Sequence, residues 1–379
     1  MLRKISFLLL TVFICVSMSS CWNYRSITVL DIVSGIAIDK DDKSGLYQIT
    51  MEIANVSSSG ENSVESIYAV TEGTTLFDAG RNSKKKLSNK FFLGNMQVLI
   101  ISSDLAKTEG IAALIDGILR DNEPRETMNI VISQEKTAKE VLCAKGLDTM
   151  TTSYEIRNIV ENDNKITSST RNTQLYDAYN AINGTGIPLI LPAFRCVPSE
   201  DGEEKNLELN GVAFFNDDRL AGFLSPEDTK YILMLSNEAK GGAFNFNFRE
   251  DIVYDVSAEI RKCYTKTSFD YHDQRLKISL SVDSDMKLIE MKESLTVTEE
   301  VKDDIEKNAS ETLKFRIEAI IKKAQNEHKI DIFGFENILY RDNNKLWKQL
   351  EKDWKNVFEN ADISVDAFIR ISDTGIIRR

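Results

Sequence analysis

The chain has 379 residues, of which 42% are hydrophobic and 28% are charged, and it contains only 5 prolines. This composition is typical of a globular protein and excludes a disordered, collagen-like or disulfide-rich small protein. The formal net charge of −12 argues against nucleic acid as the main partner, because binding a phosphate backbone needs a positive surface. A chain of this length is expected to fold as two or three domains.

The first 20 residues have the features of an export signal. Arg3 and Lys4 precede a largely apolar run over residues 5–16, and no acidic residue occurs before Cys21. A run of 12 residues is too short for a bilayer core that needs about 20, but it fits the apolar part of a secretory signal. Removing residues 1–20 leaves 45 basic and 59 acidic residues, a formal charge of −14 over 359 residues.

The end of this segment resembles a bacterial lipobox, with the string Met18-Ser19-Ser20-Cys21. In a lipobox the cysteine thiol takes a diacylglyceryl group, and cleavage then makes that cysteine the new N-terminus. Met18 departs from the usual leucine. The sequence therefore predicts a signal at 1–20 and lipid attachment at Cys21; an ordinary signal followed by a chance cysteine, or a short buried helix, are the alternatives. Since two or more acyl chains anchor stably, a lipidated Cys21 would hold the chain on the outer face of a membrane.

Residues 22–24 follow the predicted anchor, and Trp22 and Tyr24 fit either the headgroup level of the membrane or the start of a strand. The remaining cysteines are Cys143, Cys196 and Cys263, an odd number without C-x-x-C spacing. At most one disulfide can form among these three, and buried free thiols are the favoured interpretation.

The first half of the mature chain alternates between strand and helix patterns. Residues 27–38 and 46–56 predict a hairpin, and continuous apolar runs at 96–102 and 129–133 are typical of buried central strands. A further strand is expected at 65–70, an extended segment at 187–194, and helices at 76–87, 105–119, 137–144, 153–161 and 175–182.

The second half has longer strands and helices. Residues 209–215 and 220–224 predict a hairpin, after which Ser225 and Pro226 start a helix. Phe244, Phe246 and Phe248 alternate and are expected to face a core. Long alternating strands are expected at 252–260, 276–282 and 363–371, a helix from a capping box at 296–299 to about 325, and helices at 335–340 and 345–358.

The polar, turn-rich segment 198–206 predicts a domain boundary. We therefore expect an N-terminal domain of mixed α/β type at 21–200. A C-terminal α+β domain, with a largely antiparallel sheet and helices, is expected at 205–379. The second domain can divide further, which would give three domains in total. The predicted fold class is α+β and multi-domain.

The sequence contains few candidates for catalytic residues. His272 and His328 lie in separate elements without a metal-like spacing, and no nucleophile, P-loop or dinucleotide motif occurs. Gly184-Thr185-Gly186 is interpreted as a turn, and the acidic pairs 299–300 and 303–304 as the start of a helix, where the dipole favours them. The sequence predicts no enzyme, no cofactor and no metal site.

One basic run stands out in this acidic chain, formed by Arg81, Lys84, Lys85 and Lys86. A solvated helix face explains the run most simply. The alternative is contact with anionic lipid headgroups or with an acidic loop of a partner.

Several segments, in order and over nearly the whole chain, resemble the Ger(x)C family, the lipoprotein subunits of bacterial spore germinant receptors. They are residues 21–25 (CWNYR), 73–79 (GTTLFDA), 93–100 (LGNMQVLI), 209–215 (LNGVAFF), 220–224 (LAGFL), 331–335 (DIFGF), Trp347, and 353–354 (DW) with the closing strand to Gly375. Asn23 stands where the family commonly has aspartate.

The resemblance implies a multi-domain α+β protein without enzymatic activity. It implies a subunit on the outer face of the spore inner membrane that acts with integral-membrane A-type and B-type subunits in nutrient-triggered germination. Only Cys21 carries over as a site residue, and no germinant-binding residue does. The alternatives are a solute-binding lipoprotein of a transporter, which needs a cleft between two similar lobes, and a cell-envelope hydrolase.

Overall fold

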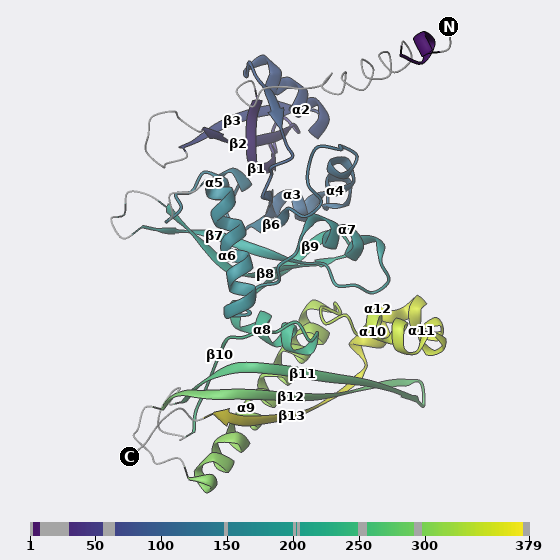
Figure 1. Ribbon diagram of the computed structural model, residues 1–379. Coiled ribbons are helices and arrows are strands. Elements are labelled where there is room, and N and C mark those ends of the chain that lie inside the picture. The colour runs from purple at the N-terminus through teal and green to yellow at the C-terminus, as the bar shows by residue number, and fades with distance from the viewer. Residues whose placement is uncertain are drawn as a thin grey trace.

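The computed structural model describes residues 3–7, 30–55, 65–147, 151–199, 202, 205–248, 256–291 and 298–373. Within these residues, a nine-stranded sheet occupies the N-terminal part and a four-stranded sheet the C-terminal part (Figure 1). Helices accompany both sheets, which confirms the α+β, multi-domain class.

The nine-stranded sheet has a parallel centre and antiparallel edges, in the order β3-β2-β1-β5-β6-β7-β8-β9 with β4 paired to β1. Its strands are β1 (Leu30–Lys40), β2 (Tyr47–Asn55), β3 (Glu65–Gly73), β4 (Lys90–Phe92), β5 (Val98–Ser102), β6 (Asn129–Ser133), β7 (Ile190–Pro198), β8 (Lys205–Asn216) and β9 (Arg219–Leu224). The predicted β1–β2 hairpin and the buried strands β5 and β6 are confirmed. Buried central strands of this kind need helices on both faces.

Helices do cover both faces of the central strands. One face carries α3 (Ser103–Thr108), α4 (Ala112–Leu119) and α7 (Leu175–Asn183), and α2 (Leu76–Asn82) with the short turn η2 (Ser83–Lys85) lies over the β2–β3 edge. The other face carries α5 (Ala138–Leu142) and α6 (Thr152–Ile166), whose Ile156 and Val160 pack on Val98 and Ile100 of β5.

The prediction of one continuous helix at 105–119 is wrong, because the structure has two helices, α3 and α4, with a break at Gly110. The φ of Gly110 is +83°, and a Cβ there would lie 2.3 Å from a carboxylate oxygen of Asp218. That carboxylate accepts a hydrogen bond from the Ala112 N–H at 3.1 Å and so caps α4 from the β8–β9 turn. A contact from 106 residues away ends the helical pattern.

The polar segment 198–206, expected as a domain boundary, lies between two strands that pair with each other. β7 and β8 pair antiparallel from Ile190 opposite Phe214 to Pro198 opposite Lys205, so β8 and β9 complete the first sheet. The chain changes sheets later, between Leu224 and Ala243. Hairpin loops and linkers share polar, turn-rich composition, which is why the sequence could not separate them. The division into separately folding domains stays a prediction.

The four-stranded sheet has the order β10-β11-β12-β13, with two antiparallel pairs and a parallel β12–β13 pair. Its strands are β10 (Ala243–Phe246), β11 (Val256–His272), β12 (Arg275–Met291) and β13 (Asp362–Asp373). The long helix α9 (Glu299–Lys323) lies along it, and the predicted apolar stripe of α9 is buried. Thr298 caps α9, whereas the expected capping residue Thr296 lies outside the described residues.

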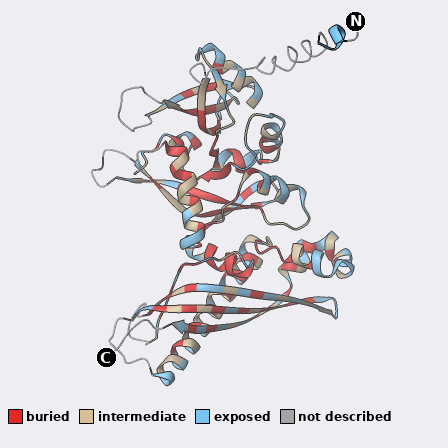
Figure 2. Ribbon diagram, viewed as in Figure 1, coloured by how far each residue is buried: buried red, intermediate tan, exposed pale blue. Residues whose placement is uncertain are grey.

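Shorter helices lie in two places, between the two sheets and near one end of the second sheet (Figure 1). They are α8 (Pro226–Leu235), η3 (Ala324–His328), α10 (Phe335–Asp342), α11 (Asn344–Leu350), η4 (Glu351–Asp353) and α12 (Trp354–Glu359). Phe244 and Phe246 are fully buried, as predicted. One apolar cluster includes them together with Val212 and Phe214 of β8, so the core of the second sheet continues onto the first (Figure 2).

Candidate functional site

The predicted lipid site Cys21 lies outside the described residues, as do Trp22 and Tyr24. Cys143, Cys196 and Cys263 are all free thiols. Burial raises the pKa of Cys263 to about 12 and that of Cys196 to about 11, so both stay protonated and weakly reactive. Cys143 is exposed, which differs from the expected burial.

The two histidines lie in different surroundings. His272 is exposed at the β11–β12 turn, and its Nε2 is 2.9 Å from a carboxylate oxygen of Asp270. His328 in η3 packs on Phe214 with ring centroids 4.7 Å apart, and in the described structure its buried Nε2 has no hydrogen-bond partner. Neither belongs to a cluster of His, Cys, Asp or Glu suited to a metal ion within the described ranges.

We predict that stability falls as the pH drops below about 6.5, the ordinary pKa of histidine. Burial, with a contribution from the charge of Lys323, lowers the pKa of His328. The unfolded chain therefore takes up this proton at a higher pH than the folded chain, and each step below 6.5 favours unfolding. In urea denaturation at about pH 7.5 and about pH 5.5, His328→Leu should reduce the difference in stability between the two conditions, whereas His272→Gln should retain it. Equal pH dependence in both variants would contradict the assignment.

The remaining sequence candidates have structural roles. Glu299, Glu300, Asp303 and Asp304 are exposed on the first turns of α9. The segment at 184–186 forms the expected turn after α7, and the Thr185 carbonyl accepts a hydrogen bond from Asn337 Nδ2 at 2.7 Å. Within the described residues, neither group lines the cavity beside Glu227 or the one between α8 and α10.

The structure brings together a set of residues where the two sheets meet, which we call the inter-sheet joint. It consists of residues 163–169, at the end of α6, and residues 240–243, before and at the start of β10. Ser168 Oγ accepts hydrogen bonds from the N–H groups of Lys240 and Gly241 at 3.0 and 3.1 Å. Lys240 Nζ donates to Asn164 Oδ1 at 3.0 Å. The C-terminal end of α6 is therefore bonded to the connection that leads into the second sheet.

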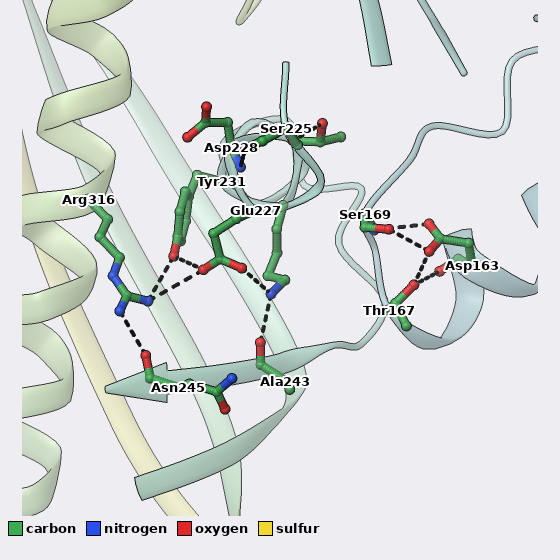
Figure 3. Close-up of polar contacts among 12 residues, drawn as sticks. Asp163, Thr167, Ser169, Ser225, Glu227, Asp228, Tyr231, Ala243, Asn245 and Arg316 are labelled. Carbon is green, nitrogen blue, oxygen red and sulfur yellow. Dashed lines mark hydrogen bonds and ion pairs between the residues drawn. The ribbon is translucent and has the colours of Figure 1, made fainter. Parts of the chain in front are cut away.

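A glycine permits the close approach in this joint. Gly242 has a φ of +113°, and a Cβ there would lie 2.4 Å from the Thr167 carbonyl oxygen. The turn after α6 is itself fixed by Asp163, whose carboxylate accepts hydrogen bonds from Thr167 Oγ1 and from the N–H and Oγ of Ser169 (Figure 3). The backbone of one sheet's helix thus contacts the backbone that enters the other sheet.

The N-terminal end of α6 is held by a buried carboxylate. Glu52 of β2 is 0% exposed, and it accepts hydrogen bonds from the N–H groups of Thr152 and Ser153 at 2.9 and 3.0 Å. The hydroxyls of Ser34 and Ser66 donate to it at 2.8 and 2.7 Å. A negative charge at a helix N-terminus is stabilising, and here it ties α6 to the β1–β2–β3 edge. The 15-residue helix, about 22 Å long, therefore connects this edge with the inter-sheet joint.

Helix α8 follows the last strand of the first sheet and begins as the sequence predicts. Ser225 Oγ accepts a hydrogen bond from the Asp228 N–H at 3.0 Å, and Pro226 occupies the first turn. Pro lacks the N–H that would be unpaired at this position, so it favours a helix start. This start places Glu227 beside the second sheet.

Glu227 is the centre of a network that joins α8 to α9 and β10 (Figure 3). Lys230 Nζ lies 2.9 Å from its carboxylate, and the Tyr231 hydroxyl donates to it. Arg316 of α9 donates to the Tyr231 hydroxyl at 3.0 Å. Two carbonyls of β10 complete the network, Ala243 at 2.7 Å from Lys230 Nζ and Asn245 at 2.8 Å from Arg316 Nη2.

The negative charge of Glu227 is paired with the positive charges of Lys230 and Arg316. Burial pushes the pKa of Glu227 upward, but hydrogen bonds from Tyr231 and Lys230 outweigh burial, so the net pKa is below the ordinary value. Burial and the hydrogen bond to Glu227 raise the pKa of Tyr231. Glu227 is thus ionised and Tyr231 neutral at physiological pH. A cavity of about 470 Å³ beside them is lined by Asn245, Arg316 and Lys323 among others.

A second carboxylate, half-buried, organises the helices at the end of the second sheet. Asp331 accepts hydrogen bonds from the N–H groups of Phe335 and Glu336 at 3.2 and 2.8 Å, and from Trp354 Nε1 at 3.3 Å. Burial raises the pKa of Asp331, although these hydrogen bonds act in the opposite direction. The Asp331–Phe335 segment and Trp354 thereby fix α10 against α12.

Sequence reasoning missed Glu52, the inter-sheet joint and the Glu227 network. Glu52 left no signal, because Gln48, Thr50 and Glu52 alternate with Ile49, Met51 and Ile53, which is the pattern of a strand with one solvated polar face. The joint left none, since serine, lysine and glycine in polar turns are common.

No helix in the described ranges combines the length and the apolar character needed to cross a membrane.

Comparison with known proteins identifies the family. The family described as "Spore germination protein N-terminal domain" matches residues 23–195, and "Spore germination B3/ GerAC like, C-terminal" matches residues 210–375. The chain belongs to this spore germination family. The resemblance to the Ger(x)C family is therefore confirmed. The two matches leave residues 196–209 between them, and this interval contains the β7–β8 connection. The two family domains therefore meet within the nine-stranded sheet, which continues across their boundary.

Relatives and a solved structure agree along the length of the chain. Spore germination protein A3 of Bacillus subtilis (strain 168) is 25% identical over 97% of both chains. Spore germination protein KC of the same organism is 22% identical over 99% of this chain and 97% of its own. The crystal structure of the GerBC protein matches with a TM-score of 0.58 over 89% of this chain and 97% of that chain, at 16% identity, and so shows the same fold.

Proposed function

We propose that this chain is the lipid-anchored subunit of a spore germinant receptor. It acts with integral-membrane A-type and B-type subunits in nutrient-triggered germination, at the outer face of the spore inner membrane, and has no enzymatic activity. The observation that carries the proposal is the match of both family domains, over residues 23–195 and 210–375. The lipobox at Cys21 supports attachment by lipid.

The described structure is suited to mechanical coupling between its two sheets rather than to catalysis. The predicted anchor precedes β1, and Glu52 of the neighbouring strand β2 holds the start of α6. The end of α6 binds the connection into the four-stranded sheet. A rigid helix held at both ends supports the transfer of displacement between the anchored edge and the second sheet, in a receptor whose other subunits lie in the membrane.

The transporter alternative is less well supported. A solute-binding lipoprotein needs a cleft between two similar lobes. Here one sheet has a parallel centre and nine strands, and the other has four strands with two antiparallel pairs. The family comparison also favours the receptor subunit.

We predict that Cys21→Ala removes the protein from the membrane fraction of spores and lowers the rate of nutrient-triggered germination by at least about tenfold. Without the lipid, the protein loses the high effective concentration that tethering gives it beside membrane partners. Membranes should be washed at high salt before fractionation, since salt removes electrostatic binding but leaves acyl chains in place. Cys143→Ala, which removes an exposed thiol elsewhere, is the matched control. Normal retention after the wash together with normal germination of the Cys21→Ala strain would overturn lipid anchoring.

A further inference from the structure

One end of the protein carries a concentrated positive surface, which we call the basic face. It is formed by α2, η2 and β4, and its charged residues are Arg81, Lys84, Lys85, Lys86 and Lys90. All of these are exposed. α2 lies at the end of the molecule away from the four-stranded sheet (Figure 1).

The charge of the basic face contrasts with the rest of the chain. Residues 74–92 contain five basic residues and one acidic residue, in a protein of formal charge −12. The acidic residue, Asp78 in the first turn of α2, accepts a hydrogen bond at 3.0 Å from the N–H of Thr74, just before the helix. Lys90 pairs with Glu123, but within the described part of the chain Arg81, Lys84 and Lys85 form no ion pair.

Apolar groups accompany these charges. Phe77 is 72% exposed, and the guanidinium of Arg81 lies 4.9 Å from the centre of its ring. Beside them a cavity of about 710 Å³ opens between α2 and α4, with Arg81 and Lys84 among its lining residues. Its apolar lining comes from the sheet and the two helices, and includes Ile36, Ile38, Ile49, Met51, Leu76 and Ile118. The charged lining residues are Arg81, Lys84, Lys90 and Arg120 against Asp121 and Glu123. A largely apolar hollow with an excess of cations beside it is complementary to an amphiphile with an anionic head.

The basic face also lies where the chain leaves the predicted anchor. Lys90 of β4 pairs with Leu30, the first residue of β1. Leu30 is nine residues after Cys21, and nine residues span at most about 30 Å. This step rests on the proposed function, because a lipid on Cys21 keeps the basic face within about 30 Å of the membrane.

We propose that the basic face binds anionic phospholipid at the membrane surface. Arg81, Lys84 and Lys85 contact the phosphate groups, while Phe77 and the neighbouring apolar cavity face the hydrocarbon. Binding here turns the basic end toward the membrane and directs the acidic remainder of the protein, with its four-stranded sheet, away from it. The basic run is then a lipid-binding surface and not only a solvated helix face.

The test uses the mature lipidated protein, reconstituted in phosphatidylcholine vesicles with or without about 30% phosphatidylglycerol. A photoreactive benzophenone amino acid replaces Phe77, and adducts are identified by mass. We expect a phosphatidylglycerol adduct, reduced about tenfold by the triple variant Arg81→Gln, Lys84→Gln, Lys85→Gln. The same charge change on α11 and η4, by Lys345→Gln, Lys348→Gln and Lys352→Gln, should leave the yield unchanged.

The outcomes separate the possible explanations. A benzophenone in place of Phe368, which is 57% exposed on β13, should give no lipid adduct. Equal adducts from the two triple variants, equal adducts with phosphatidylcholine alone, or no lipid adduct from position 77 would each overturn the proposal. Adducts to a receptor subunit instead of lipid, found when the same protein is irradiated in spore membranes, would assign the basic face to a protein partner. Failure of anchoring is recognised separately, because the protein would not remain on vesicles after a high-salt wash.

Discussion

Glu52→Gln is expected to lower the free energy of unfolding by about 3 kcal/mol. The carboxylate is fully buried and accepts hydrogen bonds from two backbone N–H groups of α6 and from the hydroxyls of Ser34 and Ser66. Glutamine keeps the shape, but its amide NH₂ cannot accept, so at least one donor at the start of α6 loses its partner inside the core. The loss is measured by urea denaturation at neutral pH.

Glu72→Gln is the matched control for this prediction. Glu72 lies on the neighbouring strand β3, is exposed, and accepts one hydrogen bond from Gln48 at 3.0 Å. The same chemical change there should cost less than about 0.5 kcal/mol. Similar costs for both variants would show that Glu52 does not hold α6 to the β1–β2–β3 edge.

Gly242→Ala is expected to destabilise the protein by at least about 3 kcal/mol. The φ of +113° is one that side chains rarely adopt, and the new methyl group would lie 2.4 Å from the Thr167 carbonyl oxygen. Thr167 and Gly242 belong to opposite sides of the inter-sheet joint, so the substitution must push the two sides apart. Urea denaturation measures the cost, and limited proteolysis should show faster cleavage near the joint.

Gly45→Ala separates backbone strain from the clash. Gly45 has a φ of +69°, but a Cβ there would meet no atom within 4 Å. Gly45→Ala should therefore lower the free energy of unfolding by about 1 kcal/mol, which is the cost of backbone strain without a steric clash. In spores, Gly242→Ala is expected to impair germination while the protein stays on the membrane, whereas Gly45→Ala should not. Normal germination of both strains would contradict a coupling role for the inter-sheet joint.

Local pattern predicted much of the fold. The stripe of Ile305, Leu313 and Ile317 recurs at helical spacing and is buried along α9, because a helix of 25 residues fixes its inner face by period alone. The short apolar runs that became β5 and β6 have no polar face to expose, so only the centre of a sheet suits them. The ordered segments that resembled the Ger(x)C family identified the family before any geometry was known.

Features that depend on distant contacts could not be predicted. Gly110 ends α3 because Asp218 caps the next helix, and the sequence near Gly110 does not contain Asp218. The segment at 198–206 has the composition of a linker, and nothing in its sequence shows that β7 and β8 on either side of it pair with each other. The inter-sheet joint depends on Ser168 meeting Lys240, which are 72 residues apart. In each case the local sequence is compatible with more than one structure, and a contact with a residue far along the chain determines which one forms.

The net charge bears directly on anchoring. Without residues 1–20 the chain carries a formal charge of −14, which an anionic membrane would repel. Attachment must therefore come from a lipid, from membrane partners, or from a local basic surface such as the basic face.

The mass of the N-terminal peptide of the mature protein, isolated from spore membranes, tests the central claim most directly. The account predicts a chain that begins at Cys21 and carries a diacylglyceryl group on its thiol. A mature N-terminus at another residue, or an unmodified Cys21 thiol in membrane-bound protein, would contradict it.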